Sequence, residues 1–79
     1  MRVLYFANVR EAIGLDGEEV DFAGSLGELG DFLAYRGGGY EVLGDRASLR
    51  VARDQVMAGF DDAVGNAREI AFFPPVTGG

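Results

Sequence analysis

The 79-residue sequence contains no cysteine and no histidine, and all seven of its basic residues are arginine. Without cysteine the chain has no disulfide, no thiolate metal ligand and no thiol nucleophile, which suits a reducing, cytoplasmic setting. Without histidine it lacks the commonest acid–base group at neutral pH. Without lysine it can form no Schiff base and offers no side-chain amine as an acyl acceptor. We therefore expect no catalytic constellation within the chain.

The sequence also lacks an apolar run long enough to span a membrane, and its start has no signal-peptide pattern. Its net charge of −6 argues against nucleic acid and against anionic membrane surfaces, because both need a basic footprint. An acidic domain is better suited to a basic protein surface. A chain of this length buries only about 60% of its unfolded surface, which predicts one domain with one modest core.

Four segments have the apolar pattern of β-strands, and a fifth has it weakly. Strict alternation of apolar and polar residues indicates a half-buried strand, and an uninterrupted apolar run indicates a strand covered on both faces. The predicted strands are residues 2–7, 18–23, 49–53 and 69–73, and residues 55–60 form a short strand or a loop.

One helix is predicted after the second strand. Ser25 and Glu28 have the spacing of a capping box, and a run of three glycines over 37–39 predicts its end. Its apolar face is predicted to comprise Leu26, Leu29, Phe32 and Leu33. A shorter helix over 9–13, capped by Asn8 and stopped by Gly14, is the first interpretation of that segment, and a turn with irregular structure is the second. This order predicts an α+β fold with one mixed sheet packed on one main helix.

The face of the sheet away from the helix carries apolar residues. If the first and last strands are neighbours, Leu4, Phe6 and Phe73 lie together on that face. A cluster of this kind on a small acidic chain predicts an interaction site. The alternative is that they are scattered surface residues, which are normal in soluble proteins.

The sequence ends FFPPVTGG. Pro74 and Pro75 restrict φ to about −65° and favour an extended chain that projects the following residues from the body. The four residues after them reach roughly 13 Å in extended form. Gly78 and Gly79 have no side chains, so they can enter a narrow channel and present the terminal carboxylate inside another protein. The alternative is a frayed end or the remnant of a tag.

Together, FFPPVTGG, the strand EIAFF before it and RVLYFANVREAIG at the start resemble the small subunits of molybdopterin synthase. The resemblance covers nearly the whole chain. That family consists of sulfur carriers with a ubiquitin-like β-grasp fold, which implies a β-grasp domain over residues 1–73 and a flexible arm over 74–79. The chain departs from the family in the turn before the last strand, which reads GNAREI, and at Asp54-Gln55, where the family often has Asn-Gln.

The resemblance implies a mechanism and two partners. An activating enzyme adenylates the carboxylate of Gly79 with ATP, and a sulfur donor converts the adenylate to a thiocarboxylate. The large synthase subunit receives the arm, and the sulfur passes to a cyclic pyranopterin to form the dithiolene of molybdopterin, in an assembly of two small and two large subunits. The carrier itself binds no cofactor. The arm that threads the channel comprises Pro74, Pro75, Val76, Thr77 and Gly78, and the implied docking residues are Phe6, Met57 and Phe73.

Three other functions fit the same tail. A related carrier feeds sulfur to thiazole or to another thio-metabolite, although such carriers usually lack the proline pair. A ubiquitin-like modifier is attached to other proteins through its carboxylate; the lack of lysine forbids only lysine-linked chains of this protein. A plain interaction domain leaves the tail without a role.

Overall fold

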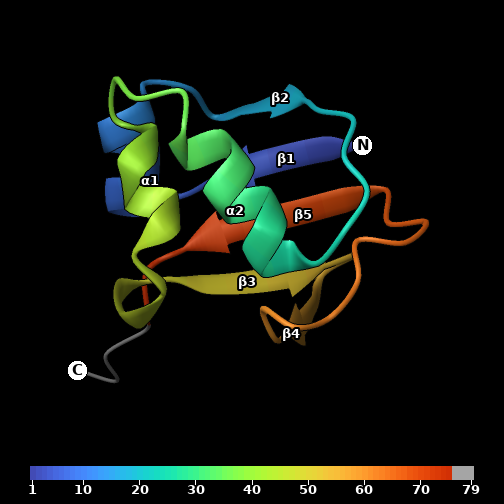
Figure 1. Cartoon of the computed structure of the whole chain (residues 1–79). Helices are drawn as coiled ribbons and strands as arrows, with labels where there is room; N and C mark the ends of the chain where they lie inside the picture. Colours follow the sequence, from blue (N-terminus) through green and yellow to red (C-terminus); the bar gives the residue numbers. More distant parts are fainter. Residues whose placement is uncertain (76–79) are drawn as a thin grey trace.

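The structure is a computed structural model in which residues 1–75 are described. Within these residues the chain forms a five-stranded sheet and two α-helices (Figure 1). The elements in chain order are β1 (Arg2–Tyr5), α1 (Ala7–Ile13), β2 (Gly17–Glu19), α2 (Leu26–Ala34), β3 (Arg50–Arg53), β4 (Val56–Ala58) and β5 (Glu69–Phe73). Two 3-10 turns, Tyr40–Gly44 and Arg46–Ser48, connect α2 to β3. Neither α-helix of the described part has the length and apolar character needed to cross a membrane.

The strands are ordered β2-β1-β5-β3-β4 across the sheet. Strands β1 and β5 are parallel, and the other three neighbouring pairs are antiparallel. Helix α2 crosses one face of the sheet, as Figure 1 shows. This is the mixed sheet on one main helix that the sequence predicts, and it confirms the β-grasp fold that the resemblance implies. Because β1 and β5 are parallel, their carboxyl ends lie at the same edge of the sheet.

The hydrophobic core lies between α2 and the inner face of the sheet. Gly30 permits the helix to approach closely, since a Cβ at this position would stand 2.6 Å from the backbone oxygen of Leu43. The helix glycines, which weaken α2 by themselves, therefore serve its packing. The largest fully buried side chains are Tyr5, Phe72, Leu26, Leu29, Leu33, Leu43, Leu49, Ile70, Val3, Val51 and Val64.

Helix α2 begins with the predicted capping box. The Ser25 hydroxyl accepts from the backbone N–H of Glu28 at 3.0 Å, and the Glu28 carboxylate accepts from the N–H of Ser25 at 2.8 Å. The predicted apolar face is wrong at Phe32, which is 48% exposed. Phe32 lies beside the stripe that points into the sheet, and its ring instead packs on Phe22 with centroids 5.0 Å apart.

The start of α1 also differs from the prediction. Asn8 lies inside the helix, and the cap residue is Phe6, which makes no side-chain capping bond. The N–H of Phe6 donates to the backbone oxygen of Phe72, so the chain passes directly from the β1–β5 ladder into the helix. The predicted end is confirmed, because Gly14 ends the helix with φ of 85°, a conformation that favours glycine.

Strand β2 is shorter than the predicted segment 18–23. It ends at Glu19, and the N–H of the next residue, Val20, donates to the backbone oxygen of Met1 while its side chain is buried. Strand β1 is likewise shorter than 2–7, because the chain leaves it for α1 after Tyr5. The alternation after β2 therefore continues to a buried side chain, Val20, outside the strand, whereas Phe6, which follows β1, is exposed.

Glu18 anchors this edge strand to the segment after α2. Its carboxylate accepts hydrogen bonds from the hydroxyls of Tyr5 at 2.9 Å and Tyr40 at 2.6 Å, and from the Arg36 guanidinium at 2.9 Å. Burial favours the neutral acid, but the bonds from Tyr40, Arg36 and Tyr5 outweigh it and hold the pKa of Glu18 below its usual value. Burial and the bond to Glu18 raise the pKa of Tyr5.

Candidate functional site

The candidate site begins where β5 ends. Phe73 is the last residue of β5, and Phe73, Pro74 and Pro75 are all half-buried. The prolines cannot donate a backbone hydrogen bond, so the sheet ladder stops where the predicted arm starts. Residues 76–79 lie outside the described part of the chain. The roles assigned to Val76, Thr77, Gly78 and Gly79, and the division between domain and arm, remain predictions.

The strand register places one row of apolar side chains across the outer face of the sheet. Leu4 pairs with Ala71, Ala71 with Ala52, and Ala52 with Met57. Paired residues on neighbouring strands point to the same side. Since Tyr5, Phe72 and Val51 point into the core, this row points away from α2.

A second row lies beside the first, at the end of the sheet where the arm begins. Phe73 pairs with Arg50, and Phe6 follows the residue that pairs with Phe72 in the parallel β1–β5 ladder. Phe6 is 45% exposed and Phe73 is half-buried. The two aromatic residues therefore flank the root of the arm, as the sequence predicts if the first and last strands are neighbours.

The implied docking residues share this outer face but do not form one tight cluster. Met57, 61% exposed, lies on the edge strand β4, whereas Phe6 and Phe73 lie at the ends of β1 and β5. Ala52 and Ala71, which are each only 9% exposed, lie between them in the register. The alternation in EIAFF places Ala71 on the face of Phe73, whereas the sequence interpretation missed Ala52, which the alternation in LRVAR could have identified. We call Leu4, Phe6, Ala52, Met57, Ala71 and Phe73 the outer apolar face.

Charged residues border the outer apolar face. Arg2 pairs with Glu19 on one side and with Glu69 on the other, and this row closes the face at the end far from the arm. Arg50 lies at the near end, where one guanidinium nitrogen donates to the backbone oxygen of Leu49. An apolar centre with a charged border is the usual composition of a protein–protein interface.

The turn between β3 and β4 sets the position of Met57. Asp54 and Gln55 both have positive φ, 50° and 69°, as a two-residue hairpin turn of type I′ requires. The Asp54 carboxylate accepts from the N–H groups of Arg68 and Glu69 at 2.9 and 3.0 Å. These two backbone bonds hold the pKa of Asp54 below its usual value and fasten the turn to the start of β5. Where the resemblance stated above leads one to expect asparagine, Asp54 uses its carboxylate to hold this turn.

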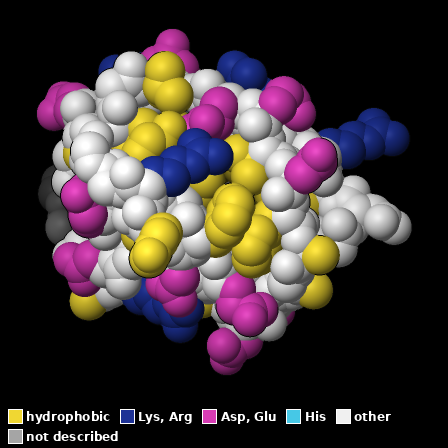
Figure 2. Space-filling model, turned by 45° about the horizontal axis from the view of Figure 1, so that its top comes forward, with side chains coloured by type: hydrophobic (Ala, Val, Ile, Leu, Met, Phe, Trp, Pro, Cys, Tyr) yellow, Lys and Arg dark blue, Asp and Glu magenta, His cyan; other side chains and the backbone are white. Residues whose placement is uncertain are grey.

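The opposite side of the molecule carries a different mixture of side chains. Figure 2 shows hydrophobic side chains gathered near the middle of this view, with acidic side chains around them. The exposed Phe32 on α2 belongs to this helix-covered side. In the described residues no group of three or more acidic, histidine or cysteine side chains is arranged to hold a metal ion.

The composition of the outer apolar face suits docking of a partner protein rather than catalysis. The outer apolar face offers no acid–base pair, because its members are alanine, leucine, phenylalanine and methionine, none of which titrates. Its aromatic end lies beside Pro74 and Pro75, the last described residues of the chain.

Comparison with known proteins gives consistent matches over the whole chain. The sequence model of the ThiS family matches residues 3–79. Two curated relatives named molybdopterin synthase sulfur carrier subunit, from Haemophilus influenzae and Escherichia coli, are 41% and 37% identical over 81 residues. Each alignment covers 100% of this chain and 99% of the relative.

Two solved structures are similar in fold. A putative molybdopterin converting factor, subunit 1, from Pyrococcus furiosus superposes with a TM-score of 0.76 at 22% identity, over 95% of both chains. This likeness supports the fold alone. The small archaeal modifier protein 1 of Haloferax volcanii superposes with a TM-score of 0.66 at 27% identity, again over 95% of both chains.

Proposed function

The chain belongs to the ThiS family, and we propose that it is the sulfur-carrier subunit of a molybdopterin synthase. The observation that carries this proposal is the outer apolar face, whose aromatic end, Phe6 and Phe73, lies at the root of the Gly-Gly tail. Full-length relatives at 41% and 37% identity bear the name of that subunit. The proline pair before the tail favours a carrier that serves molybdopterin formation over a carrier that serves thiazole formation.

In this function the reacting atom belongs to the terminal carboxylate of Gly79. A free carboxylate is a poor electrophile, so an activating enzyme first joins it to AMP from ATP and releases pyrophosphate. A sulfur donor then displaces AMP and leaves a thiocarboxylate. Gly78 and Gly79 suit a narrow channel because they have no Cβ, and Pro74 and Pro75 direct the arm away from the sheet.

The carrier works with two partners in turn. The activating enzyme and the large synthase subunit both need access to the tail, so both bind near its root. The chain supplies the sulfur and the docking face, and the partner supplies the acid–base groups, since the sequence has no histidine, lysine or cysteine. We propose that it binds no cofactor, has no enzymatic activity on its own and works in the cytoplasm.

Intact-mass measurement tests the carrier chemistry directly. The chain is incubated with ATP, its activating enzyme and a sulfur source, and fragmentation locates any change in mass. Replacement of one oxygen by sulfur at Gly79 supports the proposal. An unchanged mass in the presence of enzymes that thiolate a known carrier contradicts it.

Deleting Gly79 tests the same step through activity. We expect complete loss of molybdopterin formation in the reconstituted synthase with no change in thermal unfolding, because the core described above ends with β5. Retention of activity by the shortened chain contradicts the carrier role. The full-length protein, prepared in parallel, controls for the partner enzymes.

The similarity to small archaeal modifier protein 1 favours a second candidate function, attachment to other proteins. A modifier forms an amide between Gly79 and an acceptor lysine. Such conjugates survive thiol reagents and denaturing gels, whereas a thiocarboxylate remains on the free chain. Gel analysis of cells that express a tagged chain, followed by mass spectrometry of any larger bands, separates the two functions.

A further inference from the structure

The two edges of the sheet are protected very differently. Edge strand β2 consists of Gly17, Glu18 and Glu19, so two carboxylates lie on it. Edge strand β4 consists of Val56, Met57 and Ala58, with no charge and no proline. Val56 is 67% exposed and Met57 is 61% exposed. Proteins usually guard exposed edges with charge, proline or bulges, so a bare apolar edge marks a place where another strand can pair.

The β3–β4 register shows which backbone groups this edge offers. Arg53 and Val56 flank the two-residue turn and pair with each other, and such a pair exchanges both of its backbone hydrogen bonds. Because bonding alternates along an antiparallel pair, the N–H and C=O of the next residue, Met57, point away from β3. The corresponding groups of Gly59 are already bonded to Asp62. The free edge therefore presents one donor and one acceptor, both on Met57.

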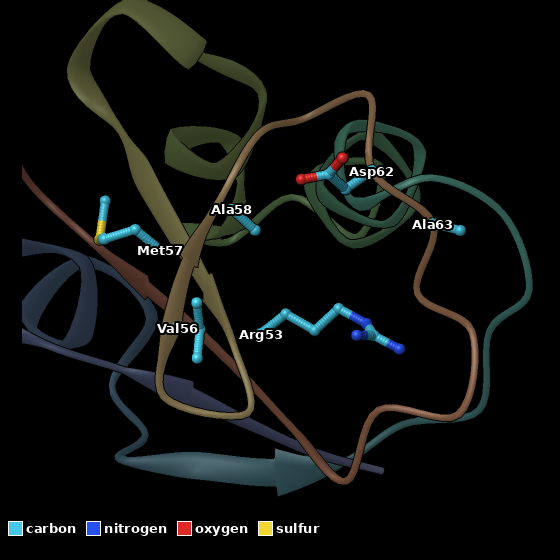
Figure 3. A pocket seen from close by; sticks show the side chains of 6 residues that line it. All are labelled: Arg53, Val56, Met57, Ala58, Asp62 and Ala63. Carbon is cyan, nitrogen blue, oxygen red and sulfur yellow. The ribbon is translucent and has the colours of Figure 1, made fainter.

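Both faces of the sheet beside β4 have room for the side chains of an added strand. On the outer side, Met57 continues the row formed by Leu4, Ala71 and Ala52. On the inner side lies an open hollow of about 420 Å³, shown in Figure 3. It is lined by Arg53, Val56, Met57, Ala58, Asp62 and Ala63.

Arg53 gives this hollow a polar wall. In Figure 3 its side chain extends from β3 toward the segment that carries Asp62 and Ala63. Its Nε donates to the backbone oxygen of Val64 at 3.1 Å. Among the described residues its guanidinium makes no ion pair. A strand added beside β4 would place one residue over Met57, and the neighbours of that residue would point into the hollow.

We propose that β4 is extended by a strand of the large synthase subunit, which pairs with Met57 while the rest of that subunit covers the outer apolar face. This inference rests on the proposed function. The occupant is the partner because the edge is continuous with the face assigned to that partner through Met57 itself. A second copy of this chain is disfavoured, since two molecules of charge −6 repel each other.

Hydrogen exchange of the unmodified protein tests the pairing. In the free chain the Met57 amide faces solvent and exchanges fast, whereas the amide of Val56 is bonded within the hairpin. On addition of the large subunit we expect exchange at Met57 to slow by roughly tenfold or more. An unchanged Met57 amide in the saturated complex overturns the proposal. Protection that appears in the free chain as its concentration rises assigns the edge to a second copy and also overturns it.

A pair of variants isolates the backbone bond from the side chain. Met57→Ala removes the side chain and keeps the N–H, whereas Met57→Pro removes both. Proline is tolerated on an edge strand where the N–H faces solvent, and thermal unfolding verifies that both variants fold. We expect the proline variant to bind the large subunit about five- to tenfold more weakly than the alanine variant. Equal affinities overturn the proposal.

Phe73→Asp separates this inference from the proposed function. If Phe73→Asp weakens binding while the two Met57 variants bind equally, the docking face stands and the edge pairing is wrong. If Phe73→Asp binds the large subunit as tightly as the unmodified chain does, the docking face is wrong, and the edge inference that depends on it is wrong as well. If Met57→Pro does not fold, the exchange measurement on the unmodified protein decides the question.

Discussion

Replacing Phe6 by alanine should weaken docking of the large subunit, and replacing Phe32 should not. The two residues form a matched pair, because both are phenylalanines and their exposed fractions are nearly equal, 45% and 48%. They differ in location. Phe6 lies on the outer apolar face at the root of the arm, and Phe32 lies on α2, on the other side of the sheet.

The expected size follows from the exposed area. A phenylalanine side chain presents about 200 Å², so the exposed part of Phe6 is about 90 Å². Burying that area at about 25 cal/mol per Å² contributes about 2 kcal/mol to docking. The corresponding change in Kd is roughly thirty- to fiftyfold. This value is an upper bound, since alanine retains the Cβ.

Calorimetric titration of the large subunit with each variant measures the effect. Thermal unfolding of both variants provides the control, because each truncation also removes some packing within the carrier. Phe32→Ala loses its contact with Phe22 and should lower thermal stability without changing Kd. Equal Kd values for the two variants, or a weaker complex for Phe32→Ala, would refute the assignment of the docking face.

Two further predictions concern the fold. Gly30→Ala should destabilise the protein by about 1–3 kcal/mol despite the better helix propensity of alanine, because its Cβ meets the backbone of Leu43. Denaturant unfolding measures this loss. Gly27→Ala should cost less stability, because the closest contact of its Cβ is the movable end of Arg46. Glu18 has a lowered pKa in the fold, so its contribution is present above its ordinary value of 4.5 and is lost as the pH falls through the lower folded value. Glu18→Gln should flatten that acid-side loss in unfolding measurements, and an unchanged slope would contradict the role of its hydrogen bonds.

Local signals in the sequence identify most of the elements. The capping box at Ser25 and Glu28 fixes the start of α2 because both partners lie within one helical turn. Gly14 ends α1 through its positive φ. Helix α2, by contrast, ends at Ala34 with Tyr35 as its C-cap in the right-handed helical conformation, so the predicted stop at the glycine run over 37–39 lies after the actual end of the helix. The alternation in EIAFF assigns Ile70 and Phe72 to the core, as observed.

The predictions from the sequence are wrong where contacts with a distant segment determine the local structure. The start of α1 depends on a backbone bond from Phe6 to Phe72, which no pattern near Asn8 encodes. Phe32 matches the helical spacing, but its position beside the core-facing stripe leaves it against Phe22 and solvent. Likewise, the hollow beside β4 arises from the meeting of β3, β4 and the segment at Asp62.

The tail proposed to react can be recognised in the sequence, whereas the face proposed to dock can be recognised only in the structure. The tail is a continuous stretch, so its proline pair and its glycines can be interpreted without knowing the fold. One row of the outer apolar face comes from Leu4, Ala71, Ala52 and Met57 on four strands, and the β1–β5, β3–β5 and β3–β4 pairings together align it. The parallel pairing of β1 with β5 joins the two ends of the chain in this face. The same pairing brings Phe6 to the root of the tail. A partner that recognises the fold through this face would thereby meet the root of the tail, whose terminus we propose to carry the reacting group.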